Sequence, residues 1–387
     1  MDATAPATAP STLPWGEVWG QDEAVAQLSA AASDPATLTH AWLITGPPGS
    51  GRSTLAHAFA AALIAEEGDE RAMHQVLSGT HPDITALRTE GVIISIKDAR
   101  ALVERSYFAP SLGRYRVIVM EDADRMTERT SNVLLKALEE PPERTVWVLC
   151  APSDADLLPT IRSRVRTLRL REPEVADVAS LIVQRTGADP AVAEQSARHA
   201  QRHIGMAQRL ATDAAARDRR DLTLRGVLRV RGVGDAVDVA GEIAKAAKDD
   251  ADALTLERNE AERAELLRMV GVAEGAAVPP AVRSQLNALE EEQKRRATRS
   301  LRDGIDRVLT DLQSMFRDVV VLQYGRHDLV NAELAPELET LAGSWSPQRT
   351  LTVLDKIALT RRNLEQNVAP ALALESLLVT VASGRTL

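Results

Sequence analysis

The sequence of 387 residues contains one cysteine, few aromatic residues and no long apolar run. Because Cys150 is alone, an intrachain disulfide framework and a cysteine-based zinc module are both excluded. Aromatic residues make up 3% of the chain, too few for widespread stacking on single-stranded nucleic acid. No run approaches the ~18 apolar residues that cross a bilayer. Residues 1–14 also lack the basic and apolar regions of a signal peptide, so we expect a cytoplasmic protein with no membrane partner.

The charge and apolar content describe a folded, acidic protein. The formal net charge is −9, which disfavours a non-specific coat on DNA but leaves room for a local basic surface. Hydrophobic residues make up 44% of the chain, enough to fill real cores. The length predicts two to three domains.

Short apolar runs alternate with helical patterns over residues 15–172. The runs are four to six residues long and are bounded by glycine, proline or charge, as buried parallel strands are. They are residues 41–45, 83–87, 116–120, 146–151 and 165–170. Apolar residues at three- and four-residue intervals predict helices over 54–66, 97–107 and 131–140. This order predicts an α/β domain with a doubly wound parallel sheet.

The strand signals stop after residue 172. Residues 173–213 predict a lid of three short helices, with breaks near 187–190 and 203–205. Residues 214–387 read as helical throughout and include a charged excursion over about 247–300. Its highly charged stretch, about 247–264, is either a long solvated helix or a mobile segment. Residues 1–14 are rich in alanine, proline and threonine and predict a disordered tail.

The strongest motif is GPPGSGRST, which directly follows the strand 41–45 and directly precedes a helical run. Glycines allow backbone N–H groups to turn toward a phosphate, and the helix N-terminus adds a positive end. A serine hydroxyl at this place can bind Mg²⁺. The expected nucleotide-binding residues of this loop are Gly46, Gly49, Gly51, Arg52, Ser53 and Thr54.

Arg52 stands where this motif normally has lysine. A compact ammonium can sit between two phosphates, and a broad planar guanidinium is not interchangeable with it. We therefore expect ATP and Mg²⁺ to bind weakly, and the chain's own ATPase activity to be weak or absent.

Glu121 and Asp122 follow the strand 116–120. ATPases of this kind hold Mg²⁺ and orient the attacking water with adjacent carboxylates at a strand end. The usual order is Asp then Glu, and its reversal displaces each carboxylate by one methylene, an error that catalysis tolerates poorly. We include both residues in the nucleotide site and predict no dedicated metal site. The alternative is that they only end a strand and begin a turn.

Further motifs carry a resemblance to a known family. The run LLKALEEPP (residues 134–142), the phosphate loop, GTHPD (79–83) and TIRSR (160–164) together resemble bacterial clamp-loader AAA+ subunits of DNA polymerase III. The resemblance covers about 17–210 and returns at 367–378, whereas 214–340 share only helical character. It implies a P-loop AAA+ domain, a small helical lid and an all-α collar domain that mediates oligomerisation.

The resemblance also implies a role for Arg164. The family's Ser-Arg-Cys motif is here Ser163-Arg164-Val165, and its arginine is a finger that reaches the ATP of the adjacent motor subunit. Such a finger contributes about 10³–10⁵ in rate. Arg164 is therefore the expected catalytic residue, and Arg162 is a weaker candidate. The alternative is that Arg164 only pairs with a local carboxylate.

Other positions depart from the active members of the family. Pro152 and Ser153 follow a strand where those members have a polar sensor, and either Gln208 or Arg209 takes the place of the lid arginine. Many relatives have four cysteines in a zinc module after the phosphate loop. Residues 65–79 contain none, so we predict no zinc and place Cys150 in a buried strand.

Direct DNA contact is weakly encoded. Thr127 and residues 130–132 precede or begin a helix, where they either bind phosphates or serve as ordinary helix caps. The basic run 294–299 follows three glutamates and predicts a salt-bridged helix face.

The departures fall on the chain's own nucleotide site, whereas Arg164 would serve a neighbour's site. This favours a clamp-loader stator that helps to place a sliding clamp on primed DNA. Its expected partners are the gamma/tau ATPase and delta subunits, the clamp, and primed DNA through the assembled complex. The polymerase (nucleotidyltransferase) activity would belong to another chain. The alternatives are an active AAA+ motor and an assembly module that binds no nucleotide.

Overall fold

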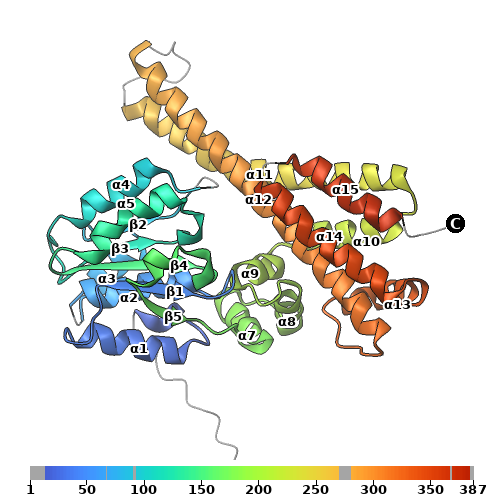
Figure 1. Ribbon diagram of the computed structural model, residues 1–387, viewed down its shortest axis with the longest axis horizontal. Helices are drawn as coiled ribbons and strands as arrows, with labels where there is room; N and C mark the ends of the chain where they lie inside the picture. Colours follow the sequence, from blue (N-terminus) through green and yellow to red (C-terminus); the bar gives the residue numbers. More distant parts are fainter. Residues whose placement is uncertain (1–13, 67, 90–92, 270–279, 367, 384–387) are drawn as a thin grey trace, which may run out of the picture. The chain divides into compact units, whose positions relative to one another are not determined.

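The computed structural model describes residues 14–383 apart from 67, 90–92, 270–279 and 367 (Figure 1). The expected disordered tail thus lies almost wholly outside the described residues. The chain divides into two compact units, one ending at Ala211 and the other beginning at Thr212. None of the described helices is long and apolar enough to cross a membrane.

The first unit is built on one parallel sheet in the strand order β2-β3-β4-β1-β5. The strands are β1 (Ala41–Thr45), β2 (Ile84–Leu87), β3 (Arg116–Met120), β4 (Thr145–Ala151) and β5 (Arg166–Arg169). The continuous apolar runs become strands because both faces of β1, β3 and β4 are buried. All five predicted strands are present, and the predicted fold class is confirmed.

Helices cover both faces of the sheet (Figure 1). They are η1 (Trp15–Glu17), α1 (Asp22–Ser33), α2 (Arg52–Ile64), α3 (Glu70–Leu77), α4 (Ile96–Ser106), η2 (Ala123–Arg125), α5 (Glu128–Glu139), η3 (Asp154–Asp156) and α6 (Pro159–Arg162). Alternate strand residues face opposite sides: Trp42 packs with α1 and α2, whereas Leu43 packs with α4 and α5. The sheet is therefore doubly wound.

Three short helices complete the first unit: α7 (Val175–Thr186), α8 (Pro190–His199) and α9 (Ile204–Thr212), which ends at the division between the units. Gly187 ends α7 with φ of 67°, and Asp189 caps α8 by accepting hydrogen bonds from two backbone N–H groups. These breaks are the ones that the sequence predicts.

The second unit is entirely helical in its described part. Its elements are α10 (Ala214–Arg229), α11 (Val233–Met269), α12 (Pro280–Gln323), η4 (Ala332–Leu334), α13 (Ala335–Ser344), α14 (Pro347–Glu365) and α15 (Pro370–Ala382). The core includes apolar side chains of both α12 and α15.

The charged excursion is part of a long antiparallel pair formed by α11 and α12 (Figure 1). Arg263 pairs with Glu290 at 2.9 Å, and Arg296 pairs with Glu262 at 3.0 Å, so ionic contacts join the two helices. Lys294 also pairs with Glu291 within α12. The predicted salt-bridged face is confirmed. Over 247–264 the long helix is the alternative observed, whereas residues 270–279 of the excursion lie outside the described residues.

Candidate nucleotide site and arginine finger

The phosphate loop connects β1 to α2 at the carboxyl edge of the sheet. Gly49 has φ of 80° and Gly51 has φ of 90°, a left-handed backbone that favours glycine. Gly51 is the N-cap residue of α2, so the free N–H groups of that helix follow the loop. Ser53 and Thr54 lie in the first turn of α2. This is the strand–loop–helix geometry of a phosphate cradle.

The Arg52 guanidinium folds back onto its own loop. Its Nη1 donates a hydrogen bond to the carbonyl oxygen of Gly46 at 2.7 Å. Burial lowers the pKa of Arg52, and the charges of Asp124 and Asp122 partly oppose that shift. To bind a phosphate, this cation would first have to leave Gly46.

The two adjacent carboxylates after β3 point to different partners. Glu121 Oε1 lies 3.9 Å from Nε2 of His57 on α2, and Asp122 Oδ1 lies 3.9 Å from Nε of Arg125. Asp124, which belongs to the same run, is buried enough that its pKa is raised, helped by the charge of Asp122. Asp124 lies on η2, two residues after Asp122.

His203 also touches the loop, which the sequence did not indicate. A Cβ atom added at Gly49 would lie 2.3 Å from Cγ of His203, so the imidazole rests directly on the glycine. The neighbouring Ile204 N–H donates to the Gly49 carbonyl at 3.3 Å. The only sequence signal was the helix break at 203–205. Gln208 and Arg209 both lie on α9, half-buried, and the choice between them as lid sensor stays open.

Cys150 lies under the loop on β4 and is fully buried, as predicted. Its Sγ lies 3.8 Å from the carbonyl oxygen of Arg52. Burial raises the pKa of this thiol to about 12, so it stays protonated and unreactive near neutral pH. Among the described residues, no group of three or more His, Cys, Asp or Glu side chains could hold a metal ion.

Arg164 lies between α6 and β5, at the amino edge of the sheet. Its guanidinium forms an ion pair with Glu139 at the end of α5, with Nε 2.7 Å from Oε1. Nη1 also donates to the carbonyl oxygen of Thr160 at 2.7 Å and to Ser163 Oγ at 3.1 Å. About a third of the Arg164 side chain is exposed. In the single chain, Arg164 therefore pairs with a local carboxylate.

A shallow depression of about 640 Å³ surrounds this ion pair. Its lining includes Thr39 and His40, which precede β1, as well as Val165 and Arg166 at the start of β5. The depression therefore opens at the amino ends of the strands. A group on a neighbouring molecule could reach Arg164 from this side.

The other candidates for binding are held by their own chain. Thr127 is the N-cap of α5 and accepts a hydrogen bond from the Thr130 N–H at 3.2 Å, as an ordinary cap does. The Thr130 hydroxyl donates to the carbonyl oxygen of Ile94 at 3.1 Å.

Two family models match the chain. The model of the DNA polymerase III delta subunit matches residues 20–174, and the model of the C-terminal part of that subunit matches residues 285–382. Over these two ranges the chain is similar to the DNA polymerase III delta subunit. The predicted resemblance to clamp-loader subunits is thus confirmed. It is also wider than expected, because the second match includes residues 285–340, in which the sequence showed helical character only.

Curated relatives agree with this family. The chain is 37% identical to DNA polymerase III subunit delta' of Pseudomonas aeruginosa over 134 residues, which cover 32% of this chain and 41% of that protein. It is 33% identical to the Escherichia coli subunit delta' over 35% of this chain and 43% of that protein. It is also 28% identical to the gamma/tau subunit of Mycobacterium bovis over 56% of this chain. The chain spans about two fifths of the length of these relatives.

Solved structures give a weaker likeness. A gamma-subunit-related protein of Thermotoga maritima aligns with 93% of this chain and 100% of its own length, at 18% identity and a TM-score of 0.44. Because that score is below 0.5, the fold assignment rests on the sheet topology itself.

Proposed function

We propose that the chain is a stator subunit of the clamp loader of DNA polymerase III. In this function it helps to load a sliding clamp onto primed DNA, with gamma/tau and delta subunits as neighbours in the complex. It supplies Arg164 to the ATP of a neighbouring motor subunit and hydrolyses little or no ATP itself. Polymerase activity resides in another chain.

One observation carries the proposal: Arg164 and the phosphate loop lie at opposite edges of the sheet. Strands β1 and β5 are parallel, with Trp42 paired to Arg166 and Thr45 paired to Arg169. Arg164 precedes β5, whereas the loop follows β1. The three residue steps between these pairs span roughly 10 Å before either loop is counted. Arg164 is therefore poorly placed for its own loop but accessible to a second molecule.

The contacts at the chain's own nucleotide site also support a subunit that hydrolyses little or no ATP itself. Arg52 is bonded to Gly46, Glu121 faces His57, and the ring of His203 rests on Gly49. Each contact would have to change for a triphosphate to bind and be hydrolysed. These contacts also favour a second candidate function, an assembly module that binds no nucleotide. Titration of the full chain with a fluorescent ATP analogue, with and without Mg²⁺, separates the two candidates.

The deciding experiment is the ATPase activity of a reconstituted clamp loader that contains Arg164→Ala. We expect the turnover stimulated by DNA and clamp to fall by about 10³-fold or more at the site beside this subunit, equivalent to about 4 kcal/mol. Arg162→Ala is the matched control, because Arg162 is also an exposed arginine and lies two residues away. We expect that variant to keep near-normal turnover.

Two results would contradict the proposal. Unchanged turnover with Arg164→Ala would remove the finger role, provided that size-exclusion chromatography shows the variant assembled in the loader. Brisk hydrolysis of Mg-ATP by the isolated wild-type chain would instead make it a motor subunit.

A further inference from the structure

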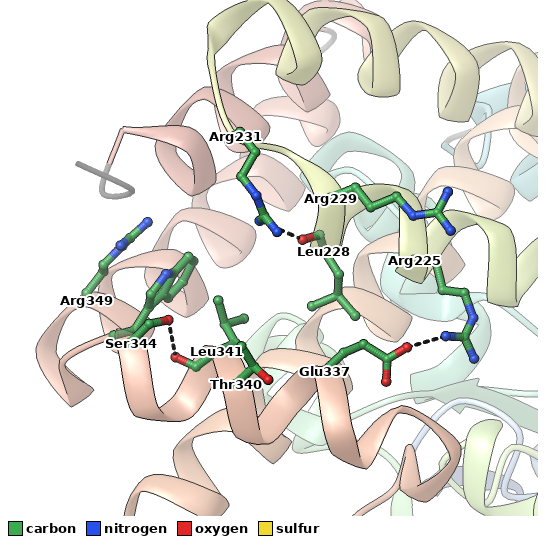
Figure 2. Close-up of a pocket in the computed structure, with 10 residues that line it drawn as sticks. Arg225, Leu228, Arg229, Arg231, Glu337, Thr340, Leu341, Ser344 and Arg349 are labelled. Atoms are coloured by element: carbon green, nitrogen blue, oxygen red, sulfur yellow. Dashed lines mark hydrogen bonds and ion pairs between the residues drawn. The ribbon is translucent and has the colours of Figure 1, made fainter. Parts of the chain in front are cut away.

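The second unit contains a pocket of about 530 Å³ that is rich in arginine (Figure 2). It lies where the end of α10 and the connection to α11 meet α13 and the start of α14. Its cationic lining consists of Arg225, Arg229, Arg231 and Arg349, and its acidic lining is Glu337. Four guanidiniums against one lining carboxylate are unusual in a chain whose net charge is −9.

One of the four arginines is already neutralised. Arg225 Nε lies 2.9 Å from Asp221 Oδ2, and its Nη1 forms an ion pair with Glu337 (Figure 2). The hydrogen bond to Asp221 raises the pKa of Arg225, although burial opposes it. The Glu337 carboxylate is thus engaged at one end of the pocket.

Arg229 and Arg231 form no ion pair with a carboxylate among the residues that the structure describes. Arg229 is exposed, and within the described part of the chain no hydrogen bond or ion pair holds its guanidinium. Arg231 Nη1 donates to the carbonyl oxygen of Leu228 at 3.1 Å. Arg349 stacks 3.6 Å over the Trp345 ring and donates to the carbonyl oxygen of Val381 at 2.9 Å. Burial lowers the pKa of Arg349. The guanidinium groups of Arg229 and Arg231 therefore have N–H donors available to an anion in this pocket.

The pocket also has an apolar floor. Leu228, Leu341 and Trp345 line it and are nearly buried. Leu222, which is 69% exposed, precedes Arg225 and Arg229 by three and seven residues on α10 and so lies on the same helix face. An apolar group and an anion can thus be bound side by side.

We propose that this pocket binds an acidic segment of a partner protein. One or two Asp or Glu carboxylates of the partner bind Arg229 and Arg231, and an adjacent apolar side chain packs on Leu228 and Leu341. Guanidinium groups favour carboxylates because two parallel hydrogen bonds can form. A cavity of this volume admits a few side chains, whereas a nucleic acid backbone needs an extended basic surface.

The test uses the full chain and a fluorescein-labelled peptide of alternating aspartate and leucine, with binding followed by fluorescence anisotropy. We expect saturable binding that weakens as salt concentration rises. Arg229→Gln and Arg231→Gln should each weaken binding about tenfold, because each removes a charge-assisted hydrogen bond. Arg326→Gln, an exposed arginine of the same unit outside the pocket, is the matched control and should leave binding unchanged.

A second peptide with asparagine in place of aspartate tests the need for charge, and we expect it to bind at least tenfold more weakly. The proposal would be overturned if the wild-type chain showed no saturable binding, if both pocket variants bound the aspartate peptide as tightly as wild type does, or if the asparagine peptide bound as tightly as the aspartate peptide. So would stronger binding of a DNA oligonucleotide that is abolished by the same variants. Because this test involves no ATP, its result is independent of the finger assignment.

Discussion

The two edges of the parallel sheet each carry an arginine of a predicted functional motif, Arg52 at the carboxyl edge and Arg164 at the amino edge, and the two side chains have different partners. At the carboxyl edge, Arg52 is half-buried, donates a hydrogen bond to a backbone carbonyl of its own loop, and has a pKa lowered by burial. At the amino edge, Arg164 is partly exposed and is held by the exposed carboxylate of Glu139. Exposed ion pairs typically contribute 1 kcal/mol or less, so the second contact is easily exchanged for another anion.

This difference shows why residue identity alone is a poor guide to function. Both positions carry a guanidinium next to motifs of a nucleotide-binding domain. The guanidinium at the amino edge can be passed to another molecule at smaller cost, because its charged partner is the exposed carboxylate of Glu139, although it also donates to the backbone carbonyl of Thr160. The comparison can be tested at each edge separately.

The largest effect expected at the level of the fold comes from Asp83, which anchors the amino edge. Its carboxylate has no exposed surface and accepts hydrogen bonds from the N–H groups of Ser111, Leu112 and Gly113 and from Arg116. Asp83→Asn leaves Arg116 buried without its counter-charge, which should cost about 3–5 kcal/mol of unfolding free energy. Denaturant unfolding followed by tryptophan fluorescence measures this, since four of the five tryptophans lie in the first unit.

The same residue gives a pH dependence. Burial alone would raise the pKa of Asp83, but hydrogen bonds from Gly113, Leu112 and Ser111 outweigh it and leave the pKa below its ordinary value. Because the pKa of Asp83 is lower in the folded state, the ionised carboxylate makes its full contribution to the free energy of unfolding above the unfolded-state pKa. That contribution is lost as pH falls through the folded-state pKa. The stability gap between wild type and Asp83→Asn should therefore be constant above about pH 5 and shrink at lower pH. A gap that widens with acid would contradict this. Glu194→Gln, which removes an exposed ion pair to Arg198, should change little at any pH.

A smaller effect is expected at the carboxyl edge from Arg52→Lys. A lysine is a compact point charge that suits the space between phosphates. We expect the affinity for Mg-ATP to rise about tenfold, equivalent to about 1.4 kcal/mol, with little gain in hydrolysis because Glu121 still faces His57. Titration with a fluorescent ATP analogue measures the affinity, and Arg129→Lys on the surface of α5 is the control. An affinity no different from wild type would show that Arg52 is not what limits binding.

The smallest effect should come from Glu139→Gln, which releases Arg164. Loss of an exposed pair should change the free energy of unfolding by less than about 1 kcal/mol. In the reconstituted loader we expect turnover to stay the same or to rise by no more than about fivefold, because the finger no longer has to leave a carboxylate. Glu140→Gln is the control on the adjacent residue. If turnover fell to the level of Arg164→Ala, Glu139 would orient the finger instead of competing for it.

The strands and the parallel, doubly wound class of the sheet could be predicted from the sequence, because buried parallel strands are continuous apolar runs between turn signals. The order of the strands could not. The phosphate loop was equally accessible, since its glycines, strand and helix are contiguous. The core side chains of α12, such as Ile305, Leu309 and Leu312, recur at the three- and four-residue spacing of one helix face.

Contacts between residues far apart in the sequence could not be predicted from local sequence patterns. The imidazole of His203 on Gly49 joins residues more than 150 positions apart, and the partner of Arg164 is 25 residues away. The arginine pocket combines α10 with α13 and α14, and each helix alone looks like an ordinary charged surface. Only the folded chain brings such groups together, so local pattern could not predict them.

The contacts between α11 and α12 change from apolar to ionic along the length of the pair. Near its base, Ala247 approaches Gly304 and both helices contribute apolar side chains such as Ile243 and Ile305 to the core. Farther out, the pair is joined by Arg263 with Glu290 and Arg296 with Glu262. Concentrated electrolyte would weaken the outer stretch while strengthening the inner one, so amide protons of the two stretches should exchange at rates that diverge with ionic strength. The stiffness of the α11–α12 pair would then depend on the salt concentration of the solution.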